Sequence, residues 1–101
     1  MKQCCNEYLM EQFGDEDVVN EIYAEYARSI QEKLPELETA LTTKNWSSLD
    51  MLAHALKGNA LATGDTDTAN VAIALRSAAK MSEEDTTRSL LEKLKKLAEE
   101  I

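Results

Sequence analysis

Residues 46–63 read WSSLDMLAHALKGNALAT, and this stretch shows the organisation of the chain most clearly. Its apolar and small side chains recur every three or four residues, which is the spacing of one face of an α-helix. Asn45 in front of it is a suitable N-cap, and Gly64 behind it suits the left-handed conformation that closes many helices. The face expected to point into a core comprises Leu49, Leu52, Ala53, Leu56, Ala60 and Thr63.

Similar apolar stripes on both sides of this helix predict further helices. They cover about residues 3–12, 17–42 and 67–80 and the segment that follows position 82. Asp65 or Asp67 is placed to cap the fourth helix, and Ser82 with Asp85 resembles a capping box for the last one. Short connections favour antiparallel neighbours. We therefore predict an all-α fold, an antiparallel up-down four-helix bundle with a short extra N-terminal helix, as a single domain over residues 1–101.

The composition excludes several kinds of partner. The chain has 19 acidic and 11 basic residues and a net charge of −8, so we expect no nucleic-acid partner and no membrane partner. Cys4 and Cys5 are adjacent, and because a bridge between neighbours is strained we expect free thiols, as in a reducing compartment. The sequence shows no secretory leader and no apolar run of roughly 18 residues, which favours a cytoplasmic protein.

His54 is the only histidine, and the pattern places it outside the core. At about 100° per residue it lies about 140° from the centre of the apolar face. Apart from Asp50 and Lys57, the side chains around it are small or apolar. Gly58 costs about 1 kcal/mol in a helix interior, which is tolerated where a partner approaches the backbone. We predict a docking patch for a partner, against the alternative of an incidental surface. Its predicted members besides His54 are Asp50, Met51, Ala55, Lys57, Gly58, Leu61 and Ala62.

The chemistry open to one exposed imidazole is limited. A metal site needs three or four ligands, so we expect no metal, and a general base needs a pocket that a convex helix face does not supply. Nucleophilic chemistry remains, in which neutral His54 attacks phosphorus and Lys57, one turn on, neutralises the phosphoryl charge. The chain has no glycine-rich phosphate loop. The residues therefore predict a phosphoryl carrier, not an enzyme, with no cofactor of its own.

The segment from His54 to Gly64, HALKGNALATG, resembles the signature of histidine-containing phosphotransfer (HPt) domains. Leu56, Lys57, Gly58, Ala60 and Gly64 stand where that family has them. The resemblance implies that His54 takes a phosphoryl group from the aspartyl-phosphate of a receiver domain and passes it to another receiver. It also implies that Lys57 stabilises the phosphoryl group, that Gly58 gives the receiver room, and that Mg²⁺ belongs to the receiver.

The resemblance leaves some questions open. Asn59 stands where the family usually has Ser or Ala, and Thr63 where an aliphatic residue is common. Response-regulator receivers are the expected partners, with a hybrid sensor kinase as a further candidate, and we expect a monomer because a carrier needs its His54 face free. The alternatives are an interaction module that binds a receiver or kinase without accepting phosphate, and a structural bundle that pairs with itself.

Overall fold

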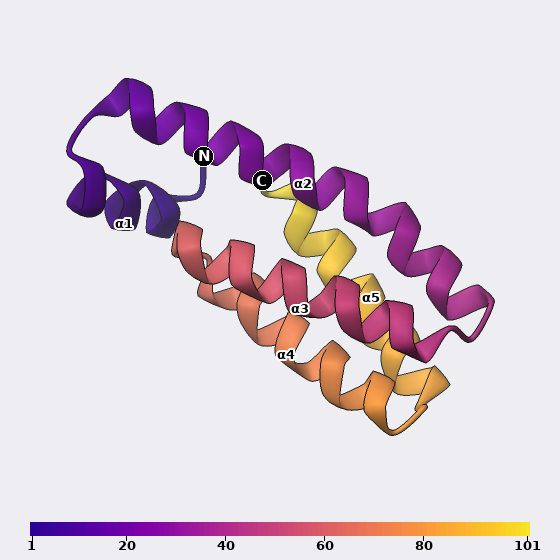
Figure 1. Ribbon diagram of the computed structural model, residues 1–101. Helices are drawn as coiled ribbons and strands as arrows, with labels where there is room; N and C mark the ends of the chain where they lie inside the picture. The colour runs from indigo at the N-terminus through magenta and orange to yellow at the C-terminus, as the bar shows by residue number, and fades with distance from the viewer.

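The computed structural model describes residues 1–101 as five helices and no strand, so the prediction of an all-α fold is confirmed (Figure 1). The helices are α1 (Gln3–Phe13), α2 (Glu16–Thr42), α3 (Trp46–Thr63), α4 (Thr66–Lys80) and α5 (Glu84–Glu99). The predicted bounds of the first four differ from these by no more than one residue, because strong end signals coincide with breaks in the apolar stripes.

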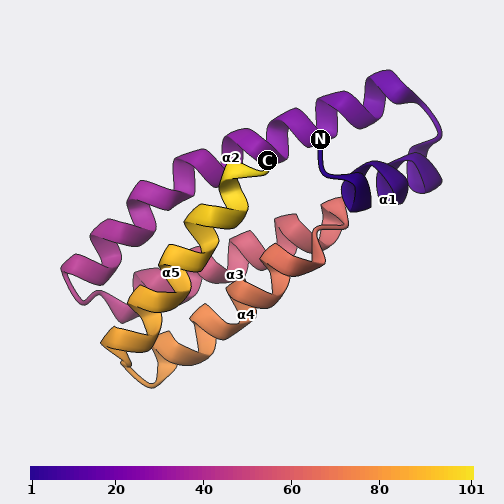
Figure 2. The same cartoon turned by 180° about the vertical axis from the view of Figure 1, so that it is seen from behind.

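Helices α2 to α5 form an antiparallel bundle in which each helix packs against two others. Helix α3 contacts α2 and α4, and α5 contacts the same two helices from the opposite side. Helices α3 and α5 therefore lie diagonally across the bundle, as the two opposite views show (Figures 1 and 2). The short α1 packs on α2 and α3, where the start of α2 meets the end of α3. The molecule is elongated, with extents of 42 × 20 × 19 Å.

The caps of α3 and α4 agree with the sequence. The side chain of Asn45 accepts a hydrogen bond from the Ser48 N–H at 3.1 Å, and that of Asp65 accepts one from the Thr68 N–H at 3.3 Å. Gly64 closes α3 with a φ of 79°, in the left-handed region. A side chain there would also collide with α1, because an added Cβ would lie 2.5 Å from the Cβ of Tyr8.

The capping box predicted for the last helix is wrong. Ser82 has a φ of 53°, and the N–H of Glu83 donates to the carbonyl of Ala78 at 3.0 Å, so Ser82 closes α4 as its left-handed residue. Glu83 becomes the N-cap of α5 and makes no side-chain cap bond. Asp85 remains exposed in the first turn of α5, where its charge suits the helix dipole.

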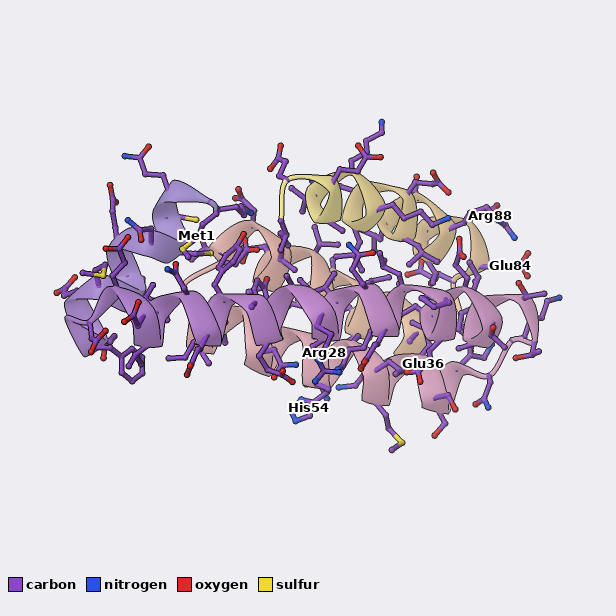
Figure 3. The ribbon with its side chains drawn as sticks, turned by 90° about the horizontal axis from the view of Figure 1, so that it is seen from above. Met1, Arg28, Glu36, His54, Glu84 and Arg88 are labelled. Atoms are coloured by element: carbon purple, nitrogen blue, oxygen red, sulfur yellow. The ribbon has the colours of Figure 1, made fainter.

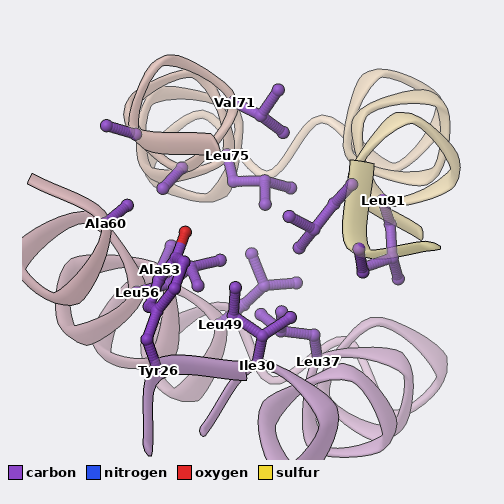
Figure 4. Close-up of a cluster of buried hydrophobic side chains, with 14 of the residues drawn as sticks. Tyr26, Ile30, Leu37, Leu49, Ala53, Leu56, Ala60, Val71, Leu75 and Leu91 are labelled. Atoms are coloured by element: carbon purple, nitrogen blue, oxygen red, sulfur yellow. The ribbon is translucent and has the colours of Figure 1, made fainter. Parts of the chain in front are cut away.

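The core is one cluster of buried side chains drawn from all five helices. Figure 4 shows the part of this cluster that lies between α2, α3, α4 and α5. The predicted core residues of α3 are all buried except Leu52, which is only half-buried. The reason lies on α2, where Pro35, Thr39 and Ala40 face this part of α3 with small side chains and leave a groove. Leu52 lines that groove and packs against the edge of the core.

A buried carboxylate, Asp65, ties the N-terminal residues to the bundle. It accepts hydrogen bonds from Lys2 Nζ at 2.7 Å, from the Tyr26 hydroxyl at 2.7 Å and from the Thr68 hydroxyl at 2.8 Å. Burial alone would raise the pKa of Asp65, but the hydrogen bonds from Lys2, Tyr26 and Thr68 outweigh it and hold the pKa below its ordinary value. Asp65 is thus a charged anchor as well as the predicted cap.

The two cysteines are free thiols, as expected. Cys4 is exposed and Cys5 is buried in the core cluster, with their sulfur atoms 4.0 Å apart. Burial raises the pKa of the Cys5 thiol to about 12, so Cys5 acts as a small apolar side chain. None of the five helices combines the length and the hydropathy needed to cross a bilayer.

Candidate functional site

His54 lies on the outer face of α3 and is exposed to solvent, as the periodicity predicted. Figure 3 shows its imidazole pointing away from the bundle, on the same side of the molecule as Arg28 of α2. The buried residues Ala53 and Leu56 hold α3 in this rotation, because they occupy the opposite half of the helix. The imidazole is therefore open to a second molecule.

The surface beside His54 toward α2 is apolar and unobstructed. Met51 is 69 % exposed, and Ala55, Gly58 and Ala62 are exposed along the same face. A Cβ built on Gly58 would meet no atom within 4 Å. No contact inside the protein therefore requires a glycine at position 58, which leaves access from outside as its physical rationale.

The surface beside His54 toward α4 carries charge. Lys57, at i+3, is half-buried, and Leu61 beyond it is 50 % exposed. Asp50, at i−4, pairs with Arg76 of α4, whose Nε donates to Oδ1 at 3.0 Å. Sequence reasoning placed Asp50 on this face but missed Arg76, because no sequence pattern states how α4 is rotated against α3.

A groove between α2 and α3 opens next to the His54 face. Its volume is about 620 Å³. Met51, Leu52 and Ala55 of α3 form one side, and Pro35 and Glu36 of α2 belong to the other. The groove is mainly apolar in its lining and continuous with the predicted docking patch, since Met51 and Ala55 belong to both.

The two departures from the family pattern have structural explanations. The side-chain amide of Asn59 donates to the Ser29 hydroxyl at 3.2 Å, and Lys33 Nζ donates to the same oxygen at 2.7 Å. Asn59 therefore fastens α3 to α2. The buried hydroxyl of Thr63 donates to the carbonyl of Asn59 at 2.7 Å, so its polar atom is satisfied where an aliphatic residue is more usual. Both residues support the helix rather than the exposed face.

The fold and the site together define a small helical bundle that presents one exposed imidazole beside a lysine. The family model described as "Hpt domain" matches residues 21–101, which leaves α1 outside the matched region. The chain belongs to this family. No curated protein and no solved structure matches the chain. Hpt domains are phosphocarriers of histidine phosphotransfer in two-component signalling, and they interact with response-regulator receiver domains and with kinases.

Proposed function

We propose that this protein carries phosphoryl groups between receiver domains, with His54 as the acceptor. One receiver would donate from its aspartyl-phosphate, and the aspartate of a second receiver would take the group from His54. The observation that carries this proposal is the exposed imidazole of His54, held on a convex face one helical turn from Lys57. Membership of the Hpt family supports the same assignment.

The bonds formed and broken in the transfer balance with the groups that His54 and the receivers supply. A ring nitrogen of neutral His54 attacks phosphorus, a P–N bond forms, and the P–O bond to the donor aspartate breaks. The aspartate leaves as a carboxylate, and the proton on the other ring nitrogen goes to water. The second receiver reverses these steps with its own carboxylate as the nucleophile. Because the chain needs no nucleotide for this exchange, we propose that it has no cofactor and that Mg²⁺ is held by the receiver.

Lys57 and the apolar face have separate roles in this proposal. The Lys57 ammonium would neutralise part of the charge on the transferred group. The receiver would cover the docking patch formed by Met51, Ala55, Gly58, Leu61 and Ala62, with Asp50 at its edge. The adjoining groove would accept an apolar side chain of the receiver. We also propose that the protein works as a monomer, because self-association through this face would cover His54.

A two-receiver relay tests the proposed function. One receiver is loaded with labelled phosphate, freed of its donor and mixed with this protein and Mg²⁺, and a second receiver is added afterwards. We expect the label to appear on this protein in an acid-labile, base-stable form and then to move to the second receiver. Binding of a receiver without any transfer of label would instead make the protein an interaction module.

Two substitutions of Gly58 test the stability of the protein and the docking of a receiver separately. Gly58→Ala should raise the free energy of unfolding by about 1 kcal/mol, since the new methyl group enters open space and alanine favours helix. Gly58→Gln should fold as well as the natural protein, yet slow phosphoryl transfer by roughly tenfold or more, because its side chain stands where the receiver must approach. Urea unfolding and stopped-time transfer assays measure the two effects. Normal transfer by Gly58→Gln would remove Gly58 from the proposed docking patch.

A further inference from the structure

One ion pair lies within a helical turn of His54, and the proposal above assigns no role to its arginine. It joins Asp50 of α3 to Arg76 of α4 at 3.0 Å, with the two side chains 29 % and 26 % exposed. Only the Nε of Arg76 has a partner, so both terminal nitrogens of the guanidinium are free to bind another acceptor. The two side chains are partly buried, and ion pairs that keep this much contact with water stabilise a fold only weakly. Holding α3 against α4 is therefore a weak reason for it.

The position of the pair relative to His54 follows from helix geometry. Asp50 is four residues before His54 and Lys57 three residues after it, and side chains at these spacings lie about 5–6 Å apart at Cβ. Around the helix axis, Asp50 and Lys57 both fall on one side of His54, by about 40° and 60°. The contact with Arg76 shows that this side faces α4. Lys57 and the Asp50–Arg76 pair thus lie on the α4 side of His54, one helical turn after it and one before it.

Phosphorylation of His54 would change the balance of charges here. A phosphoryl group brings nearly two negative charges, which the Asp50 carboxylate repels and the Arg76 guanidinium attracts. Guanidinium groups bind phosphate oxygens through paired N–H donors, and the free donors of Arg76 are of this kind. Asp50 is the only acidic side chain that pairs with Arg76. It holds the guanidinium near His54 while no phosphate is present.

We infer that Arg76 is a second phosphoryl-binding residue. Arg76 pairs with Asp50 while His54 is unphosphorylated, and it binds the phosphoryl group once His54 carries one. This inference rests on the proposed function of His54. It distinguishes the two members of the pair, because Arg76 would stabilise the phosphorylated form and Asp50 would oppose it. A purely structural ion pair would make the loss of either residue equivalent.

The test compares end points of transfer rather than rates. Phosphorylated receiver and this protein are mixed at concentrations too low for a stable complex, and the distribution of label between them is measured once it stops changing. This distribution depends on the stability of phosphohistidine and not on how tightly the two proteins dock. The variants are Arg76→Gln and Asp50→Asn, with Arg88→Gln as the control, because Arg88 is exposed on α5 and pairs only with Glu84 and Asp85.

We expect Arg76→Gln to lower the ratio of phosphorylated to free His54 by about three- to tenfold, and Asp50→Asn to raise it by about two- to threefold. Arg88→Gln should leave it unchanged. Equal shifts in the same direction for Arg76→Gln and Asp50→Asn, or no shift for Arg76→Gln, would overturn the role of Arg76 while leaving His54 as the acceptor. Absence of label on His54 in the natural protein would overturn the proposed function and this inference with it.

Discussion

A protein with glutamine in place of His54 is expected to accept no phosphoryl group from any receiver. The amide nitrogen of glutamine has no available lone pair, so the P–N bond cannot form. His54 is exposed to solvent on the outer face of α3, and therefore His54→Gln should fold like the natural protein. The expected result is a complete loss of acid-labile, base-stable label, measured after incubation with phosphorylated receiver and Mg²⁺.

The matched control introduces glutamine on another face of the protein. Lys96 is exposed on α5, which lies diagonally across the bundle from α3, and Lys96→Gln should take up label as fast as the natural protein. Circular dichroism should give the same helical signal for both variants. Uptake of label by His54→Gln at the natural rate would mean that another side chain carries the phosphate.

The second large effect is expected on stability, at Asp65. Asp65→Ala leaves the Lys2 ammonium and the Tyr26 and Thr68 hydroxyls without their acceptor. Removing one partner from a buried charged network costs about 3–5 kcal/mol, which is a large share of the 5–15 kcal/mol typical of a domain. We expect urea unfolding to show a loss of this size and the melting temperature to fall by roughly 10 °C or more.

Asp67→Ala is the control for this change, because Asp67 lies two residues further on and is exposed. It should cost no more than about 1 kcal/mol, the value of an acid in the first turn of a helix. A loss below 1 kcal/mol for Asp65→Ala as well would show that the buried network contributes little to the fold.

Asp65 also predicts how stability depends on pH. Its pKa in the folded protein lies below the ordinary value, so its contribution is fully present above the unfolded-state pKa of about 3.9. The contribution is lost as the pH falls from there through the folded-state pKa. The natural protein should therefore lose stability more steeply than Asp65→Ala below about pH 4. Parallel curves for the two proteins in that range would contradict this role of Asp65.

Much of the fold follows from local patterns in the chain. Stripes at helical spacing placed the helices, and Asn45 and Gly64 marked the ends of α3 as predicted. Interactions between distant residues were not predictable in this way. Lys2 and Tyr26 reach Asp65 across 63 and 39 residues of chain, and no short motif links them. The cap at Asp65 was visible in the sequence, but the network that it anchors was not.

In the candidate site, too, some features were predictable from the sequence and others were not. The position of His54 and of its neighbours on the outer face of α3 depends on one helix, so the periodicity of that helix was enough to predict it. Arg76 depends on the rotation of α4 against α3, and the groove depends on which small side chains of α2 face Leu52. These features require the packing of two helices. The role of His54 as phosphoryl acceptor stays a proposal, on which the docking patch and Arg76 both depend.

Because His54 is the only histidine, nuclear magnetic resonance can observe its ring nitrogens without interference. A long-range proton–nitrogen spectrum of the natural protein would be recorded before and after incubation with phosphorylated receiver and Mg²⁺. We expect the ring-nitrogen signals to move to the positions of a phosphorylated imidazole, in step with the gain of one phosphoryl group in the intact mass. A gain in mass with the imidazole signals unchanged would contradict the assignment of His54 as the phosphoryl acceptor.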